Sequence, residues 1–169
     1  MTENVYQNEI TIKGKLISIV ERKLVSGEIH LMTLEKLYSA KADENGNFTL
    51  TFPEKVLTEY NIVTINCTLS DEKKEYQEQK TSILKKEELL GKEEFEIQER
   101  YMTIGAVSYT VPDPPDYYFL DGKKIGKRKF EKIKKENPHY KYFTFYEENI
   151  IQRLTKKSFV DNLYLLYSN

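Results

Sequence analysis

The sequence predicts a mainly β protein in which an antiparallel β-sandwich is followed by a small α+β unit. Between residues 8 and 69, apolar and polar side chains alternate with a period of two, which is typical of strands with one buried face. Prolines and aspartates then interrupt the chain at residues 111–116, a composition typical of a stiff extended linker. Beyond this linker, segments with the apolar spacing of a helix alternate with segments typical of short strands. We therefore expect two domains, 1–111 and 112–169.

The sandwich is expected to begin with a strand over residues 10–16, whose apolar side chains all fall on one side. A turn is predicted at residues 43–46, because Asn45 and Gly46 adopt positive φ at low cost. Pro53 should end the strand that follows, since it cannot donate to a ladder. Further strands are predicted over residues 28–31, 37–42, 48–52 and 61–69. These strands should share one core that contains Ile10, Ile12, Leu16, Phe48, Leu50, Phe52, Val63 and Ile65.

The segment from residue 71 to residue 100 is strongly charged, with ten acidic and seven basic side chains. We interpret it as a solvated hairpin or edge segment, with an acidic binding surface as the alternative. Phe95 and Ile97 alternate with charged residues, which predicts a strand exposed on one face. Residues 102–111 are more apolar and are expected to return to the sheet.

The second domain is predicted to contain two helices and three strands. Phe130 and Ile133 are three positions apart on the buried side of a helix over 126–136, and Asn137-Pro138 ends it. An Asp121-Gly122 turn precedes this helix, and a second helix is expected over 147–157. The three strands are predicted over residues 117–120, 140–146 and 163–167.

Composition excludes several classes of function. The 26 basic and 27 acidic residues leave a net charge of −1, so no global field attracts nucleic acid or an anionic membrane. No stretch approaches the roughly 20 apolar residues of a membrane-spanning helix. Cys67 is the one cysteine, which excludes an intrachain disulfide and a cysteine-based zinc cluster. Its place on the apolar side of a strand predicts a buried structural thiol.

The sequence offers no catalytic constellation. His30 and His139 lie over 100 positions apart without metal-ligand spacing, and His30 fits a strand. No serine stands in a G-x-S-x-G context, and the seven glycines are too scattered for a phosphate-binding loop. We therefore expect a protein that is not an enzyme, with no catalytic residues, no cofactor and no metal.

The sharpest charge feature is the run from residue 121 to residue 135, with eight basic and two acidic residues. Its expected helix could present a basic face to a partner, or it could be only a solvated surface. A further interpretation is that this helix contacts nucleic acid or anionic lipid. Balanced total charge and the lack of a base-stacking motif argue against nucleic acid. The partner we expect is another protein with an acidic surface, bound by Lys127, Arg128, Lys132 and Lys135.

Two segments of the first domain resemble a known family. They are ITIKGKLI at residues 10–17 and ADENGNFTL at residues 42–50. They resemble the early "I-x-G-x-V" strand and the "D-x-x-G-x-F" hairpin of the carboxypeptidase regulatory-like (transthyretin-like) domain. That resemblance implies a small β-sandwich and carries over no catalytic residues. The family is widespread in envelope and secreted proteins of Bacteroidetes.

A shorter segment near the C-terminus resembles a second family. YYFLDGKKI at residues 117–125 is similar to the "DG-x-x-I" element of TonB-dependent receptor plug domains.

Together these features predict a non-enzymatic accessory or protein-interaction protein of a bacterial cell envelope. The alternative is a cytoplasmic protein-binding partner, such as a toxin-neutralising or assembly-associated factor. A periplasmic or envelope location is expected if a signal peptide has been removed from the chain, and a cytoplasmic one otherwise. The sequence leaves the identity of the partner and the oligomeric state open.

Overall fold

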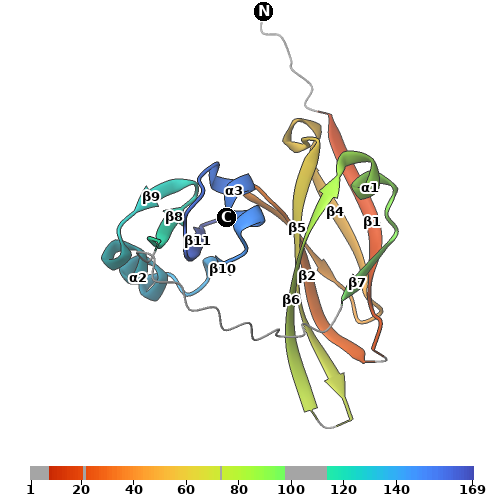
Figure 1. Ribbon diagram of the computed structural model, residues 1–169. Coiled ribbons are helices and arrows are strands. Elements are labelled where there is room, and N and C mark those ends of the chain that lie inside the picture. Colours follow the sequence, from red (N-terminus) through yellow and green to blue (C-terminus); the bar gives the residue numbers. More distant parts are fainter. Residues whose placement is uncertain (1–7, 21, 73, 98–113) are drawn as a thin grey trace, which may run out of the picture. The chain divides into compact units, whose positions relative to one another are not determined.

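The computed structural model describes residues 8–20, 22–72, 74–97 and 114–169, which divide into two compact units (Figure 1). Residues 8–32 and 38–97 belong to the first unit, and residues 33–37 and 114–169 to the second. Both units are built on β-sheets, which confirms the mainly β fold class. The predicted strand over 102–111 and the predicted domain boundary at 111/112 lie outside the described residues.

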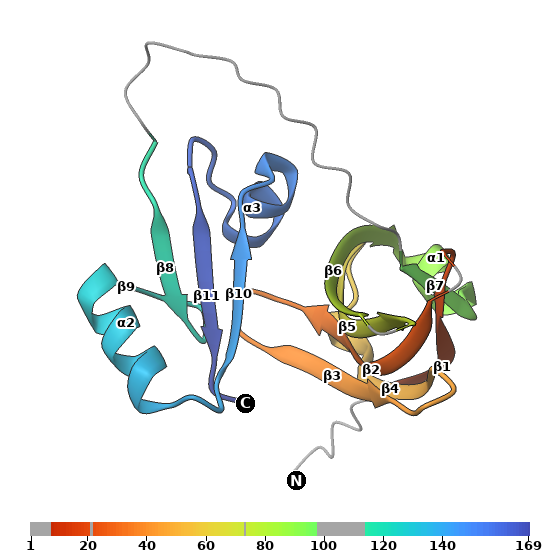
Figure 2. The ribbon, with the colours of Figure 1, turned by 90° about the horizontal axis from the view of Figure 1, so that it is seen from below.

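The first unit is a sandwich of two sheets. One sheet has the order β4-β1-β7 and the other the order β3-β2-β5-β6. Figure 2 shows the two sheets of this unit curving around a common interior. The strands are β1 (Glu9–Ser18), β2 (Lys23–Met32), β3 (Leu37–Ala42), β4 (Asn47–Pro53), β5 (Tyr60–Asp71), β6 (Lys74–Lys85) and β7 (Glu94–Ile97); two short helices, η1 (Glu54–Val56) and α1 (Lys86–Gly91), complete the unit.

Alternation along the strands builds the core. In β4, the side chains of Phe48, Leu50 and Phe52 are buried, while those between them are exposed. Seven of the eight expected core residues lie in one buried cluster, and Ile10 is partly buried against it. The turn before β4 is held by the Asp43 carboxylate, which accepts the backbone N–H groups of residues 45 and 47 at 2.9 Å. The predicted strand over 48–52, its buried face and the predicted turn at 43–46 are confirmed.

Two features of the first unit were not predicted. β7 pairs with β1 in parallel, at a register that brings Phe95 opposite Leu16. The helix α1 follows β6 with one buried side chain, Leu89, which is too little for a recognisable helical period. The hairpin or edge prediction for the charged segment holds for β6, which pairs with β5 as a hairpin and is the edge of its sheet. The segment is not solvated throughout, because Leu84, Leu89, Phe95 and Ile97 lie in the buried core.

The second unit is a four-stranded mixed sheet with two helices. The strand order is β10-β11-β8-β9, with β8 and β11 parallel in the middle. Figures 1 and 2 place α2 and α3 on opposite sides of this sheet. The short strand β9 was not predicted. The elements are β8 (Tyr117–Leu120), β9 (Lys123–Ile125), α2 (Lys127–Glu136), β10 (Lys141–Phe145), α3 (Glu148–Thr155) and β11 (Leu163–Tyr167).

The connection between β2 and β3 is part of the second unit. The Tyr167 hydroxyl donates a hydrogen bond to the Thr33 carbonyl at 2.7 Å, and the Asn169 side chain donates to the Leu37 carbonyl at 3.1 Å. Burial raises the pKa of Tyr167 far above its usual range, with the Asp121 carboxylate as a second cause. The sequence did not predict that residues 33–37 belong to this unit.

Candidate functional site

The predicted basic face lies on helix α2. Lys127, Arg128, Lys132 and Lys135 are all exposed there, on one short and regular element. Lys132 lies 4.0 Å from Glu136 one turn later, a surface pair that contributes little to stability. The four cations are therefore available to a partner on the described surface of this helix.

The N-terminal end of α2 concentrates cations where a helix does not favour them. Lys127 and Arg128 stand in the first turn, which contains no acidic residue, and Gly126 caps the helix without a side-chain hydrogen bond. The unpaired N–H groups of a first turn carry partial positive charge, so anions stabilise this end and cations destabilise it. Helix stability does not explain these residues. Their charge and that of the helix end instead add to one positive surface.

A cluster of aromatic rings fixes α2 on the sheet. Phe130 is the buried residue of the helix, and its ring centroid lies 5.2 Å from Tyr118, 6.1 Å from Tyr142 and 6.2 Å from Tyr164. Tyr118 and Tyr164 stack with their centroids 4.8 Å apart, and the Tyr142 ring runs nearly parallel to that of Tyr164. This aromatic platform therefore anchors the basic helix, because a helix of ten residues is marginal on its own.

Cations also lie over the tyrosines of this unit. The ammonium of Lys134 is 3.7 Å from the ring centroid of Tyr142, and that of Lys124 is 4.0 Å from the ring centroid of Tyr117. Burial raises the pKa of Tyr164, and the Asp116 carboxylate adds to the shift. Each of these two ammonium groups lies over the face of a tyrosine ring, a geometry in which cation–π attraction holds the lysine.

The structure brings together three polar residues that the sequence did not connect. In the first unit, His30 is fully buried, and its Nδ1 lies 2.6 Å from the Ser39 hydroxyl on β3. Its Nε2 lies 3.4 Å from the Glu28 carboxylate. Glu28 and His30 are two positions apart on β2, so they share one face of the strand. We interpret the group as a polar tie between β2 and β3, a role that depends on strand pairing and leaves no motif in the sequence.

Cys67 lies beside a polar groove of about 680 Å³ on the four-stranded sheet. The groove crosses this sheet, with Glu28 and Lys41 at one side and Gln79 at the other. Cys67 itself is buried, as predicted. Burial raises the pKa of its thiol to about 11, and the Glu78 carboxylate adds to the shift. A thiol with a raised pKa is a poor nucleophile, which fits a structural role.

Two further properties concern metals and membranes. Within residues 8–20, 22–72, 74–97 and 114–169, no three His, Cys, Asp or Glu side chains are grouped so that they could hold a metal ion. In the same part of the chain, no helix is both long enough and apolar enough to cross a membrane.

Comparison with known proteins identifies no relative. No family model, no curated protein and no solved structure matches this chain. The resemblances to the carboxypeptidase regulatory-like domain and to the receptor plug element therefore stay predictions.

Proposed function

We propose that this protein is a non-enzymatic protein-interaction module and that helix α2 binds an acidic surface of a partner protein. The observation that carries the proposal is the placement of Lys127 and Arg128 in the first turn of α2, against the helix dipole. Residues that weaken their own helix but add to a common positive field are better explained by binding than by folding.

Charge is also divided unevenly along the chain. Residues 114–169 carry twelve basic and seven acidic side chains, a net charge of +5, whereas residues 1–113 carry 14 basic and 20 acidic side chains, a net charge of −6. The net charge of the whole chain is therefore close to zero although residues 114–169 are strongly basic. An acidic partner would be steered toward that unit, with an association rate that falls as salt rises.

The cellular setting of this binding is proposed from the sequence resemblance. An accessory role in a bacterial cell envelope fits a sandwich of the carboxypeptidase regulatory-like kind. The second candidate is a cytoplasmic partner protein, such as a toxin-neutralising or assembly-associated factor, which would use the same basic helix. The native gene start distinguishes them, because an upstream signal peptide favours the envelope.

The first experiment measures binding of a fluorescently labelled, glutamate-rich polypeptide by anisotropy across a salt titration. Alanine replacement of Lys127, Arg128, Lys132 and Lys135 is expected to weaken binding about tenfold or more at low salt and to flatten the salt dependence. Thermal stability should stay nearly unchanged, because exposed substitutions have small effects.

The matched control removes the same charge from the first unit. Lys13, Lys23, Lys55 and Lys85 are exposed there, and their fourfold alanine variant should bind the polypeptide like the wild type. Equal losses in both variants would show a diffuse charge effect and contradict the proposal. Stronger binding of a single-stranded DNA oligonucleotide than of the polypeptide would also contradict it.

A second prediction separates binding from folding at the first turn of α2. Replacing Lys127 and Arg128 with glutamate should abolish binding of the acidic polypeptide, since two attractive charges become repulsive. The same change should leave the melting temperature equal or raise it by a few degrees, because glutamates at this helix end interact favourably with the dipole. A clear fall in melting temperature, measured by circular dichroism, would show that these residues serve the fold.

A further inference from the structure

The longest sheet edge of the described structure is strand β6. It is the last strand in the order β3-β2-β5-β6, and it pairs with β5 over all twelve of its residues. The β5–β6 register runs from end to end without a shift, unlike the β2–β5 register, which shifts between Leu24 and Ser26. No other described strand pairs with the outer side of β6. As far as residues 8–20, 22–72, 74–97 and 114–169 are concerned, a regular row of backbone donors and acceptors therefore remains along this edge.

The other edges of the first unit are short or interrupted. β4 ends in Pro53, β7 has four residues and β3 has six. The sequence of β6, KEYQEQKTSILK, contains neither proline nor glycine. Long regular edges without proline or bulges are templates for pairing with another strand, and the charged side chains on such an edge restrict which strand can pair. β6 is thus the edge of this unit that is best suited to strand addition.

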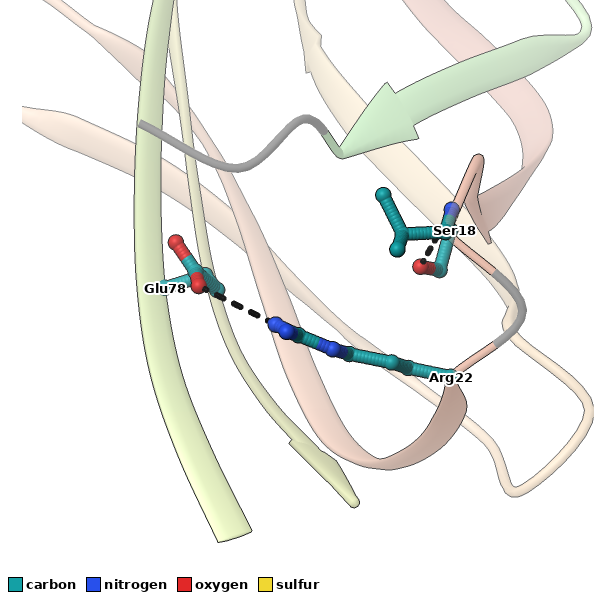
Figure 3. A network of polar contacts seen from close by, with 4 residues as sticks. Ser18, Arg22 and Glu78 are labelled. Atoms are coloured by element: carbon teal, nitrogen blue, oxygen red, sulfur yellow. Dashed lines mark hydrogen bonds and ion pairs between the residues drawn. The ribbon is translucent and has the colours of Figure 1, made fainter. Parts of the chain in front are cut away.

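Side-chain contacts hold β6 in place before any partner arrives. The Arg22 guanidinium forms an ion pair with the Glu78 carboxylate (Figure 3). The two groups are 3.7 Å apart, and the guanidinium also lies 3.9 Å from the ring centroid of Tyr76. On the same face, the Lys80 ammonium donates to the Glu96 carbonyl at 2.9 Å. Because the strand is already ordered, pairing along it would lose little conformational entropy.

We propose that β6 pairs antiparallel with β6 of a second copy of this chain, with Gln79 on the two-fold axis. In this register Glu78 faces Lys80 of the second copy, and by symmetry the pair forms twice. Gln77 faces Thr81 of the second copy, so that polar residues continue the outer face of the sheet. Opposite charges and amide–hydroxyl pairs directly across an antiparallel ladder stabilise it. Such a contact is self-complementary and closes as a dimer.

The charged side chains of β6 favour this register over registers that are shifted by one or two residues. A shift of two residues in one direction places Glu78 opposite Glu78 of the second copy. A shift of two residues in the other direction places Lys80 opposite Lys80 of the second copy. Like charges directly opposite are destabilising, and a shift of one residue would turn side chains to the wrong face. The β6 sequence therefore favours one symmetric pairing, which points to a second copy rather than to an unrelated strand.

The test measures the mass of the protein by sedimentation equilibrium over concentrations up to the millimolar range. The wild type is expected to dimerise. Lys80→Glu and Glu78→Lys should each weaken the dimer about tenfold or more, because each places two like-charge pairs across the axis. A mixture of the two variants should recover a heterodimer, since both cross-strand pairs are then opposite in charge.

Lys74→Glu is the matched control, because Lys74 lies on the same face of β6 but faces Leu84 in the proposed register. It should dimerise like the wild type. The double variant with Glu78→Lys and Lys80→Glu in one chain should also dimerise, which controls for loss of the Arg22 contact in the single variant. A wild type that stays monomeric, charge reversals without effect, or a mixture that fails to recover the dimer would each overturn the proposal.

Discussion

Replacing Phe48 with alanine is expected to lower the free energy of unfolding of the first unit by about 3–5 kcal/mol. The Phe48 ring is 4% exposed and meets the ring of Phe95 edge-on at 5.3 Å, so it joins β4 to β7 across β1. It also covers Gly14, where an added Cβ would lie only 2.7 Å from the ring. Gly14 has no side chain of its own to fill the space that Phe48 leaves, so a cavity is expected there.

Urea denaturation checks this prediction, with hydrogen exchange of β1 and β4 as a readout specific to the first unit. A fall in the midpoint without a change in slope would show a loss of stability alone. Thr49→Ala is the control, because Thr49 is exposed on the same strand and its truncation should change stability by about 0.5 kcal/mol or less. An equally small effect for Phe48→Ala would contradict the assignment of this ring to the core.

Phe130→Ala should lower the free energy of unfolding of the second unit by a similar amount, about 3–5 kcal/mol. The residue is 2% exposed and is the buried residue by which α2 contacts the tyrosines. Small domains have little stability in reserve, roughly 0.05–0.15 kcal/mol per residue, so the loss would be comparable to the whole stability of this unit. We expect α2 to detach and binding of the acidic polypeptide to fall, although all four cations remain.

Near-ultraviolet circular dichroism of the stacked tyrosines and hydrogen exchange of β8 and β11 measure this outcome. Phe130→Leu, which keeps most of the apolar volume, should retain both signals and binding. Lys129→Ala, a neighbouring exposed change, should leave stability nearly unaltered. Native tyrosine signals in Phe130→Ala would show that the platform holds without this ring, against our interpretation of the cluster.

Elements whose signals are local were predicted well. The strands β3, β8 and β11 have the bounds expected from the sequence. The helix predicted over 126–136 is confirmed as α2, with Gly126 as its N-cap and Phe130 on its buried side. In each case the apolar residues and the flanking turn residues that predict the element lie within a few positions of one another. Such signals can be read without knowing what the element packs against.

The candidate site was predicted in part. The four cations of α2 could be identified from sequence because they are adjacent and their helix is amphipathic. The aromatic platform beneath them could not, since Tyr118, Tyr142 and Tyr164 come from three different strands. Their stacking depends on the order β10-β11-β8, which no local pattern encodes.

By itself, the sequence determined the fold class, most strand and helix positions, the buried faces of β1, β4, β5 and β7 and the basic character of α2. Only the tertiary structure decided the parallel pairing of β1 with β7, the membership of residues 33–37 in the second unit and the contact of His30 with Ser39. The physical reason is separation along the chain. Periodicity and turn chemistry act over a few residues, whereas register, sheet order and side-chain clusters depend on contacts formed when distant segments pack together.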